Sequence, residues 1–226
     1  MEKAVIQGIS LEISPEEALR ALKMPGDAEE EDVQSIRQML EDCLKIASPK
    51  AVYCVAPIEE KGEDFVVAGG TRIDSPLVRK NLEAANRIIP YVATCGREAE
   101  EWAGQFQDPL EAYWADGIKL LLLERIRRAL TTQVRERLFP QGDMSSMSPG
   151  SLQAWPLTAQ RTLFALIGTV GEDTGVELTD SCLMLPSKSN SGFFFAGKEH
   201  YENCSLCPIL TCPTRRAPYE GPALQE

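Results

Sequence analysis

The sequence of 226 residues predicts an α+β fold, and three observations favour this class. Segments with apolar residues at helical spacing are interspersed with short strand-like runs. The strand-like runs follow one another as hairpins, without the regular strand–helix–strand alternation that builds a parallel sheet. No stretch of roughly 20 to 50 residues repeats along the chain, which disfavours solenoids and propellers.

Composition and charge narrow the class of protein. The chain has 43% hydrophobic and 25% charged residues, which is typical of a globular protein with a sizeable core. A net charge of −11 argues against nucleic acid or an anionic membrane as the main partner. The first ten residues lack a signal pattern, and the longest apolar run, Ile118 to Leu123, is too short to span a bilayer. We therefore expect a cytoplasmic protein.

Two helices are predicted at the start of the chain. Ser14 has the features of an N-cap, since a proline follows it at the first helical position and Glu17 stands at capping-box spacing. This helix should end near Lys23. Asp27 should cap a second helix, whose apolar residues at helical spacing are Val33, Ile36, Leu40, Cys43, Leu44 and Ala47.

Strands are predicted next. Runs 51–58 and 65–68 flank the polar loop EEKGED and predict a hairpin. The sequence Asp74-Ser75-Pro76 should open another short helix, and 87–94 should form a buried strand.

The junction after this strand, Cys95-Gly96-Arg97-Glu98, allows two interpretations of its cysteine. A position before a helix N-terminus lowers the pKa of a thiol and could create a reactive thiolate. Alternatively, Cys95 is a small buried residue at a tight turn.

Residues 109–139 predict one long amphipathic helix, with a possible kink at Gly117. Its apolar stripe comprises Leu120, Leu123, Ile126, Leu130, Val134 and Leu138. The arginines of this helix are interleaved with Glu124 and Glu136, which predicts a solvated face. The segments that follow are predicted as a loop over 141–156, a helix over 157–167, and strands over 176–185 and 192–196.

Three of the seven cysteines lie close together near the end of the chain. Cys204, Cys207 and Cys212 form the pattern C-x-x-C-x-x-x-x-C-P, whose spacing allows the three thiolates to ligate one metal centre. Both an iron–sulfur cluster and zinc fit this pattern, and Cys182 or Cys95 could supply a fourth ligand. Three free thiols in a tail are the alternative. A single histidine, His200, nearly excludes sites that need several imidazoles.

Three blocks carry a family resemblance: EAYWADGIKLLLLERIRRAL, SPGSLQAWPLTAQRTLFALIG and GVELTDSCLMLPSKSNSGFFF. Their order and spacing resemble the activation (reactivation) domain of cobalamin-dependent methionine synthase, and more closely the stand-alone bacterial proteins related to it. The resemblance covers roughly residues 91–201. It divides the chain into N-terminal helices and a hairpin (1–90), the activation-like region (91–201) and a cysteine-containing tail (202–226).

The resemblance implies a curved α+β domain with a twisted, mainly antiparallel sheet. It also implies binding of S-adenosylmethionine and reactivation of an oxidised cobalamin. The adenosylmethionine motif of the family is R-x-x-x-G-Y, and the matching positions here are Ser146, Gly150 and Ser151. The arginine and tyrosine are thus absent, and a serine cannot replace the charge-assisted contact that a guanidinium makes with a carboxylate. The residues that we expect to contact the ligand are Ser148, Pro149, Gly150, Ser151 and Tyr201.

The sequence has no D-x-H-x-x-G motif for cobalamin, so a cobalamin would arrive with a corrinoid-carrying methyltransferase partner. The functional hypothesis is an accessory protein of cobalamin-dependent methyl transfer, served by a redox partner. Two alternatives are an iron–sulfur electron-transfer protein and a zinc-stapled interaction module without methyl-transfer activity.

Overall fold

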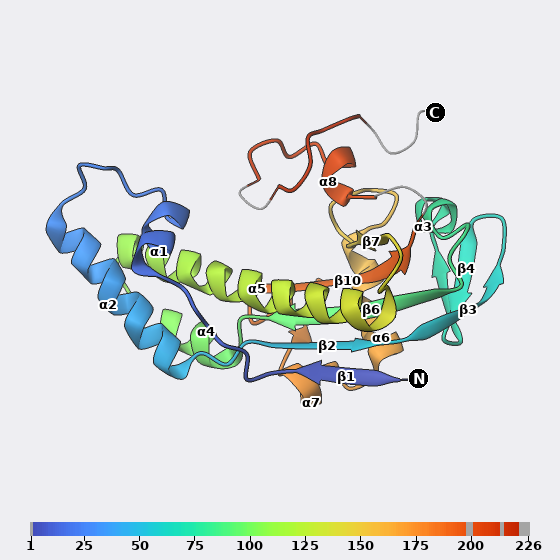
Figure 1. Cartoon of the computed structure of the whole chain (residues 1–226), viewed down its shortest axis with the longest axis horizontal. Helices are drawn as coiled ribbons and strands as arrows, with labels where there is room; N and C mark the ends of the chain where they lie inside the picture. The colour runs from blue at the N-terminus through green and yellow to red at the C-terminus, as the bar shows by residue number, and fades with distance from the viewer. Residues whose placement is uncertain (1, 198–200, 213–214, 222–226) are drawn as a thin grey trace.

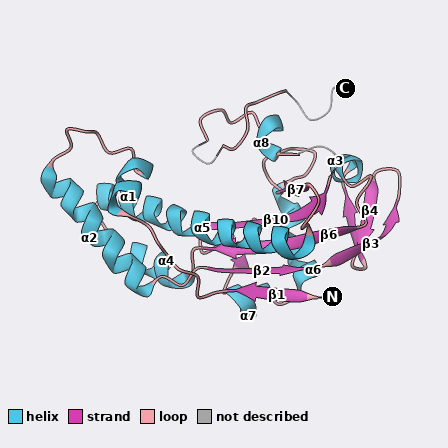
Figure 2. Ribbon diagram, in the orientation of Figure 1, coloured by secondary structure: helices cyan, strands magenta, loops and turns pink. Residues whose placement is uncertain are grey.

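The computed structural model describes residues 2–197, 201–212 and 215–221, and the predicted α+β class is confirmed (Figures 1 and 2). The strands are β1 (Lys3–Ile6), β2 (Lys50–Cys54), β3 (Ala56–Lys61), β4 (Phe65–Ala68), β5 (Thr71–Asp74), β6 (Arg87–Thr94), β7 (Met144–Met147), β8 (Glu177–Leu178), β9 (Met184–Leu185) and β10 (Ser189–Ala196). The helices are α1 (Pro15–Ala21), α2 (Glu30–Ile46), α3 (Pro76–Asn81), α4 (Arg97–Ala103), α5 (Pro109–Leu138), α6 (Gln160–Ile167), α7 (Val170–Thr174) and α8 (Asn203–Leu206).

Strand β6 is the centre of an antiparallel sheet. One of its edges pairs with β10, and the other pairs first with β2 and then with β3. Strand β1 adds to β2, the β4–β5 hairpin adds to β3, and β7 adds to β10. Seven of the eight residues of β6 are buried, as expected of a strand that is paired on both edges and covered on both faces.

Helices cover both faces of this sheet. Because side chains alternate along a strand, Tyr53 and Tyr91 face α5, while Val52 and Val92 face the opposite side. The buried residues of the α5 layer include Leu123, Ile126, Leu130, Val134 and Phe194. The opposite layer is closed by Ile167 of α6 and Val170 of α7. The sheet is therefore the middle layer of three.

Helix α5 extends beyond the sheet and joins α1, α2 and α4 in a second core (Figure 1). The large side chains of this core include Ile36, Leu40, Trp102, Trp114 and Ile118. The helix runs without interruption through Gly117, where the predicted kink would lie. A Cβ atom there would lie 2.3 Å from Cδ2 of Leu22, so glycine allows close approach of the chain after α1.

Several predicted elements differ from the observed ones. The single strand predicted over 51–58 is divided at Val55 into β2 and β3. Both strands pair with β6, and β3 also pairs with β4. The strand predicted over 176–185 is a small β8–β9 hairpin, with Cys182 at a φ of 63°. Strand β7 lies inside the predicted loop 141–156, and β10 begins at Ser189.

Within the described ranges, no helix combines the length and apolarity needed to cross a membrane.

Cys95 is a buried residue at the end of β6, as the second interpretation predicted. Its exposed fraction is 0%, and burial raises the pKa of its thiol to about 12. The reactive-thiolate interpretation is therefore wrong, because desolvation outweighs any lowering by the helix that follows. Burial likewise raises the pKa of Cys43 to about 12 and that of Cys54 to about 11.

These thiols should resist alkylation in the folded protein. A thiol with a pKa of about 12 is ionised to about one part in ten thousand at pH 8, and the thiolate is the nucleophile. We expect iodoacetamide to modify Cys95 at least about a hundredfold more slowly in native than in urea-unfolded protein. Peptide mass spectrometry measures both rates, with the half-buried Cys204 as the internal comparison. Equal rates at Cys95 in the two states would contradict this account.

Candidate functional site

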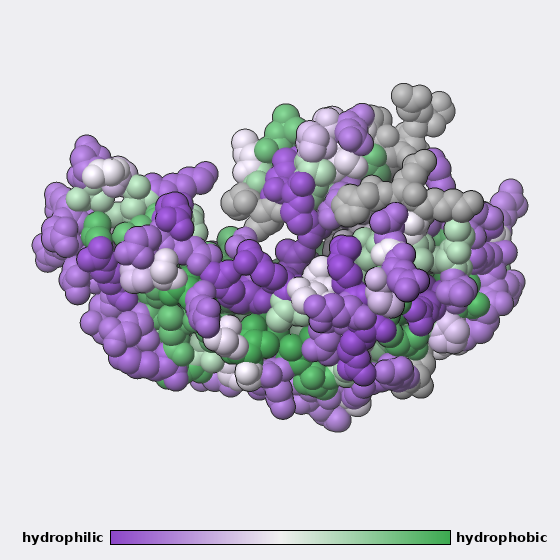
Figure 3. All heavy atoms as spheres, in the orientation of Figure 1, coloured by the Kyte–Doolittle hydropathy of each residue, from purple (hydrophilic) through white to green (hydrophobic). Residues whose placement is uncertain are grey.

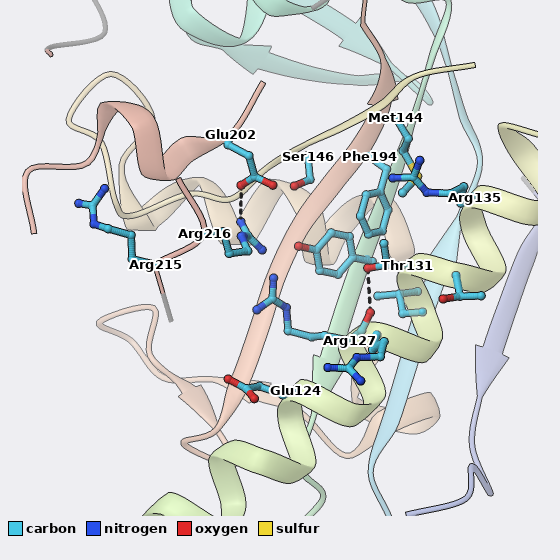
Figure 4. A pocket seen from close by; sticks show the side chains of 14 residues that line it. Glu124, Arg127, Thr131, Arg135, Met144, Ser146, Phe194, Glu202, Arg215 and Arg216 are labelled. Carbon is cyan, nitrogen blue, oxygen red and sulfur yellow. Dashed lines mark hydrogen bonds and ion pairs between the residues drawn. The ribbon is translucent and has the colours of Figure 1, made fainter. Parts of the chain in front are cut away.

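A cavity of about 480 Å³ lies between the C-terminal half of α5, the β7–β10 edge and the segment after β10 (Figure 4). Its floor contains Tyr91 and Phe194, whose rings stack with centroids 4.7 Å apart. The hydroxyl of Tyr91 donates to Oδ1 of Asn190 at 3.0 Å. Ser146 of β7 also lines this cavity. The size is within the range of small-molecule sites.

Arginines dominate the charged lining of the cavity. Arg127, Arg128 and Arg135 come from α5, and Arg215 and Arg216 come from the C-terminal segment. The carboxylates in the lining belong to Glu124 and Glu202. The prediction of a solvated face for the α5 arginines was therefore incomplete, because these side chains also line a cavity. The whole chain has a net charge of −11, so this cavity is a positively charged region of an acidic protein.

The two arginines of the C-terminal segment have partners. The guanidinium of Arg215 donates to the carbonyls of Cys204, Cys207, Ile209 and Ala217 at 2.6–2.9 Å. Arg216 forms an ion pair with Glu202 at 2.9 Å. For Arg127, Arg128 and Arg135, the described part of the chain supplies no ion pair or hydrogen bond to the guanidinium. The unpaired positive charge of the cavity thus comes from α5.

The predicted ligand turn, Ser148 to Ser151, lies immediately after β7. Gly150 has a φ of 96°, and its N–H donates to the carbonyl of Trp155 at 3.0 Å. A Cβ atom at Gly150 would lie 2.8 Å from Cδ1 of Leu157. The positive φ and this close contact explain why glycine occupies the turn.

Helix α8 docks on this turn through Asn203, which is 6% exposed. Its Nδ2 donates to the carbonyl of Ser148 at 2.6 Å and to Oγ of Ser151 at 2.9 Å, and its Oδ1 accepts from the N–H of Ser148 at 3.4 Å. Strand β7 and the start of α8 are further joined by a bridge between Ser146 and Glu202. The chain itself therefore satisfies polar groups that were predicted to contact a ligand.

Tyr201, the remaining predicted contact, packs on the apolar core next to the turn. Its ring lies 6.4 Å from that of Phe195, and its N–H donates to Oγ of Ser145 at 3.0 Å. Its hydroxyl is buried and makes no hydrogen bond within the described residues. Burial, with a contribution from the charge of Glu202, raises the pKa of Tyr201 above its usual range. Tyr201 thus packs on the same apolar core as Leu152 and Trp155, which follow the turn.

The three clustered cysteines lie in and after α8. Cys207 is buried, whereas Cys204 and Cys212 are half-buried. Among the described residues, no group of three His, Cys, Asp or Glu side chains is arranged to hold a metal ion. The guanidinium of Arg215 organises this segment through the carbonyls of Cys204 and Cys207. The metal centre at these cysteines, with Cys95 or Cys182 as a fourth ligand, therefore stays a prediction. His200 lies outside the described residues.

The cavity arginines and Asn203 were not predicted from the sequence. Residues 127, 131 and 135 are separated by four positions, a spacing that places them on one face of a helix. This spacing could have predicted that the two arginines share a face of the helix. The docking of Asn203 had no comparable signal, because a single asparagine shows nothing of its distant partners.

The sequence matches no protein-family model, and no curated protein matches it significantly. The fold, however, matches a solved structure, that of the MetH reactivation domain bound to AdoHcy. The TM-score is 0.67, the sequence identity is 17%, and the match covers 89% of this chain and 81% of the other. The chain therefore has the fold of the MetH reactivation domain.

Proposed function

We propose that this protein is an accessory protein of cobalamin-dependent methyl transfer, which reactivates an oxidised corrinoid carried by a partner protein. The observation that carries the proposal is the shared fold, together with an arginine-lined cavity in this chain. The chain shares its fold with a reactivation domain whose structure contains AdoHcy, and Ser146, which lines the cavity, lies two residues before the turn predicted for adenosylmethionine.

The chemistry of the cavity fits an adenosyl amino acid. Such a ligand carries a carboxylate, an ammonium group and a flat aromatic base. The lining offers unpaired guanidinium groups from α5, a carboxylate from Glu124, and the stacked pair of Tyr91 and Phe194. Pockets of this kind combine apolar area with a few polar groups that fix orientation. S-adenosylmethionine is therefore the methyl donor that we assign to this cavity.

The corrinoid belongs to a partner in this proposal, because the chain lacks the D-x-H-x-x-G motif. The corrinoid would supply a nucleophilic cobalt after reduction by an external electron donor, and adenosylmethionine would supply the methyl group. The surface is hollowed between the lobe of α1 and α2 and the C-terminal segment, with hydrophilic residues along the floor of the hollow (Figure 3). This hollow offers room for the partner, and the cavity residues would hold the donor and orient its methyl group.

Methyl transfer in trans tests this function. The probe is a cobalamin-dependent methionine synthase without its own reactivation domain, loaded with cob(II)alamin and supplied with S-adenosylmethionine and titanium(III) citrate. We expect the full chain to accelerate the appearance of methylcobalamin, followed by its absorption spectrum. A rate equal to that without the chain, at every concentration of chain and donor, would count against the proposal.

Gly150→Val should remove this activity. A side chain at a φ of 96° strains the turn and would press on Leu157. The strain would reach the cavity through Asn203, which bonds to the turn and follows the cavity residue Glu202. Gly70→Val is the matched control, since Gly70 has a φ of 74° in the β4–β5 turn and open space around it. Both variants should lose stability, but only Gly150→Val should lose binding of S-adenosylhomocysteine by calorimetry. Equal affinity in the two variants would show that the conformation of the turn does not support the site.

A metal centre at Cys204, Cys207 and Cys212 stays a prediction of the spacing alone. Among the described residues, no group of three potential ligands is arranged to hold a metal ion. On the spacing, anaerobically purified protein should contain iron and sulfide, or zinc, and Cys207→Ser should contain less. Metal analysis decides among the alternatives. Iron supports the electron-transfer function, zinc alone supports the structural staple, and the lack of both ends the hypothesis.

A further inference from the structure

We propose that Arg127 and Arg135 of α5 form an anion-binding pair that holds the carboxylate of the ligand in the cavity. The identity of the ligand, an adenosyl amino acid, rests on the function proposed above. The anion-binding character rests on the geometry of α5 and on the charges around the cavity.

The two arginines lie on the same face of α5. They are separated by eight residues, with Thr131 midway between them, so their Cα atoms lie about 12 Å apart along the helix. Long arginine side chains can close such a gap around a small anion. The hydroxyl of Thr131 donates to the carbonyl of Arg127 on the same helix, and it lines the cavity between the two cations. Figure 4 shows these side chains on α5, opposite Ser146 and Phe194.

These two guanidinium groups lack partners within the described part of the chain. Arg127 is half-buried, and a guanidinium that loses part of its hydration gains from a charged acceptor. Two like charges beside one cavity also repel each other, and a bound anion relieves that repulsion. An anion therefore has more to gain here than at the arginines of the C-terminal segment. Arg215 and Arg216 are already occupied, by backbone carbonyls and by Glu202.

Carboxylate is the anion that fits the rest of the cavity. A bidentate guanidinium contact suits the planar geometry of a carboxylate. The aromatic floor of Tyr91 and Phe194 and the carboxylate of Glu124 leave room for the uncharged and cationic parts of the same ligand. Ser146, which also lines the cavity, has no charge with which to hold a carboxylate. In this chain, the arginines of α5 would then supply the positive charge that holds the ligand carboxylate.

Calorimetry with two ligands tests the pair in the full-length protein. S-adenosylhomocysteine carries the amino-acid carboxylate, and 5′-methylthioadenosine lacks the whole amino-acid end. The wild type should bind the first at least about tenfold more tightly than the second, as expected for a charge-assisted contact. In Arg127→Gln and Arg135→Gln this ratio should fall to about threefold or less, whereas Arg127→Lys should retain part of it.

Arg137→Gln is the control, because Arg137 lies on the same helix, is exposed, and pairs with Glu2 outside the cavity. Circular dichroism confirms folding of each variant.

The other outcomes separate this inference from the proposed function. Equal affinity of the wild type for the two ligands would overturn the anion-binding pair and leave adenosyl binding intact. A ratio that persists in both glutamine variants would likewise place the carboxylate elsewhere. If the wild type binds neither ligand at millimolar concentration, the proposed methyl donor and this inference both fail.

Discussion

One helix connects the two cores of this protein, and the position of the candidate site depends on it. Helix α5 has 30 residues, which corresponds to about 45 Å. Its first half is buried among α1, α2 and α4, and its second half covers the central strands of the sheet. Because both halves are fixed by apolar packing, the polar face of the second half is held at a set distance from β7 and β10. The cavity is the space that this arrangement leaves.

The C-terminal segment closes the cavity from a third side. Asn203 bridges Ser148 and Ser151, so the turn after β7 and the start of α8 are held by shared hydrogen bonds. Asn203 is almost completely buried, and an unmade hydrogen bond at a buried amide or carbonyl costs about 1–3 kcal/mol. A ligand that contacted the same backbone groups would have to displace Asn203. We therefore place the proposed ligand in the cavity rather than on the turn itself.

The sequence predicted elements whose own residues determine them. The cap at Ser14, the stripe along α5 and the buried run of β6 are local patterns, and the structure contains all three. Strands β1, β5 and β7 were not predicted, because each is stabilised by pairing with another strand rather than by a pattern of its own. Strands β1 and β7 pair with β2 and β10, far away along the chain, and β5 pairs with the neighbouring β4. The same limit applies to the site. The turn at Gly150 could be identified from its residues, but the cavity is made where α5, β7 and the C-terminal segment meet. That meeting is a tertiary contact that no local pattern reports.

Hydrogen–deuterium exchange with and without S-adenosylhomocysteine tests the central claim, that α5, β7 and the C-terminal segment enclose one ligand site. Bound ligand should slow exchange in peptides from three separate stretches: 127–135, 144–151 and 201–207. Peptides of α2 and of the β4–β5 hairpin, which lie away from the cavity, should exchange at the same rate in both states. Protection confined to another region of the chain, or no protection at a concentration that saturates binding, would contradict the account.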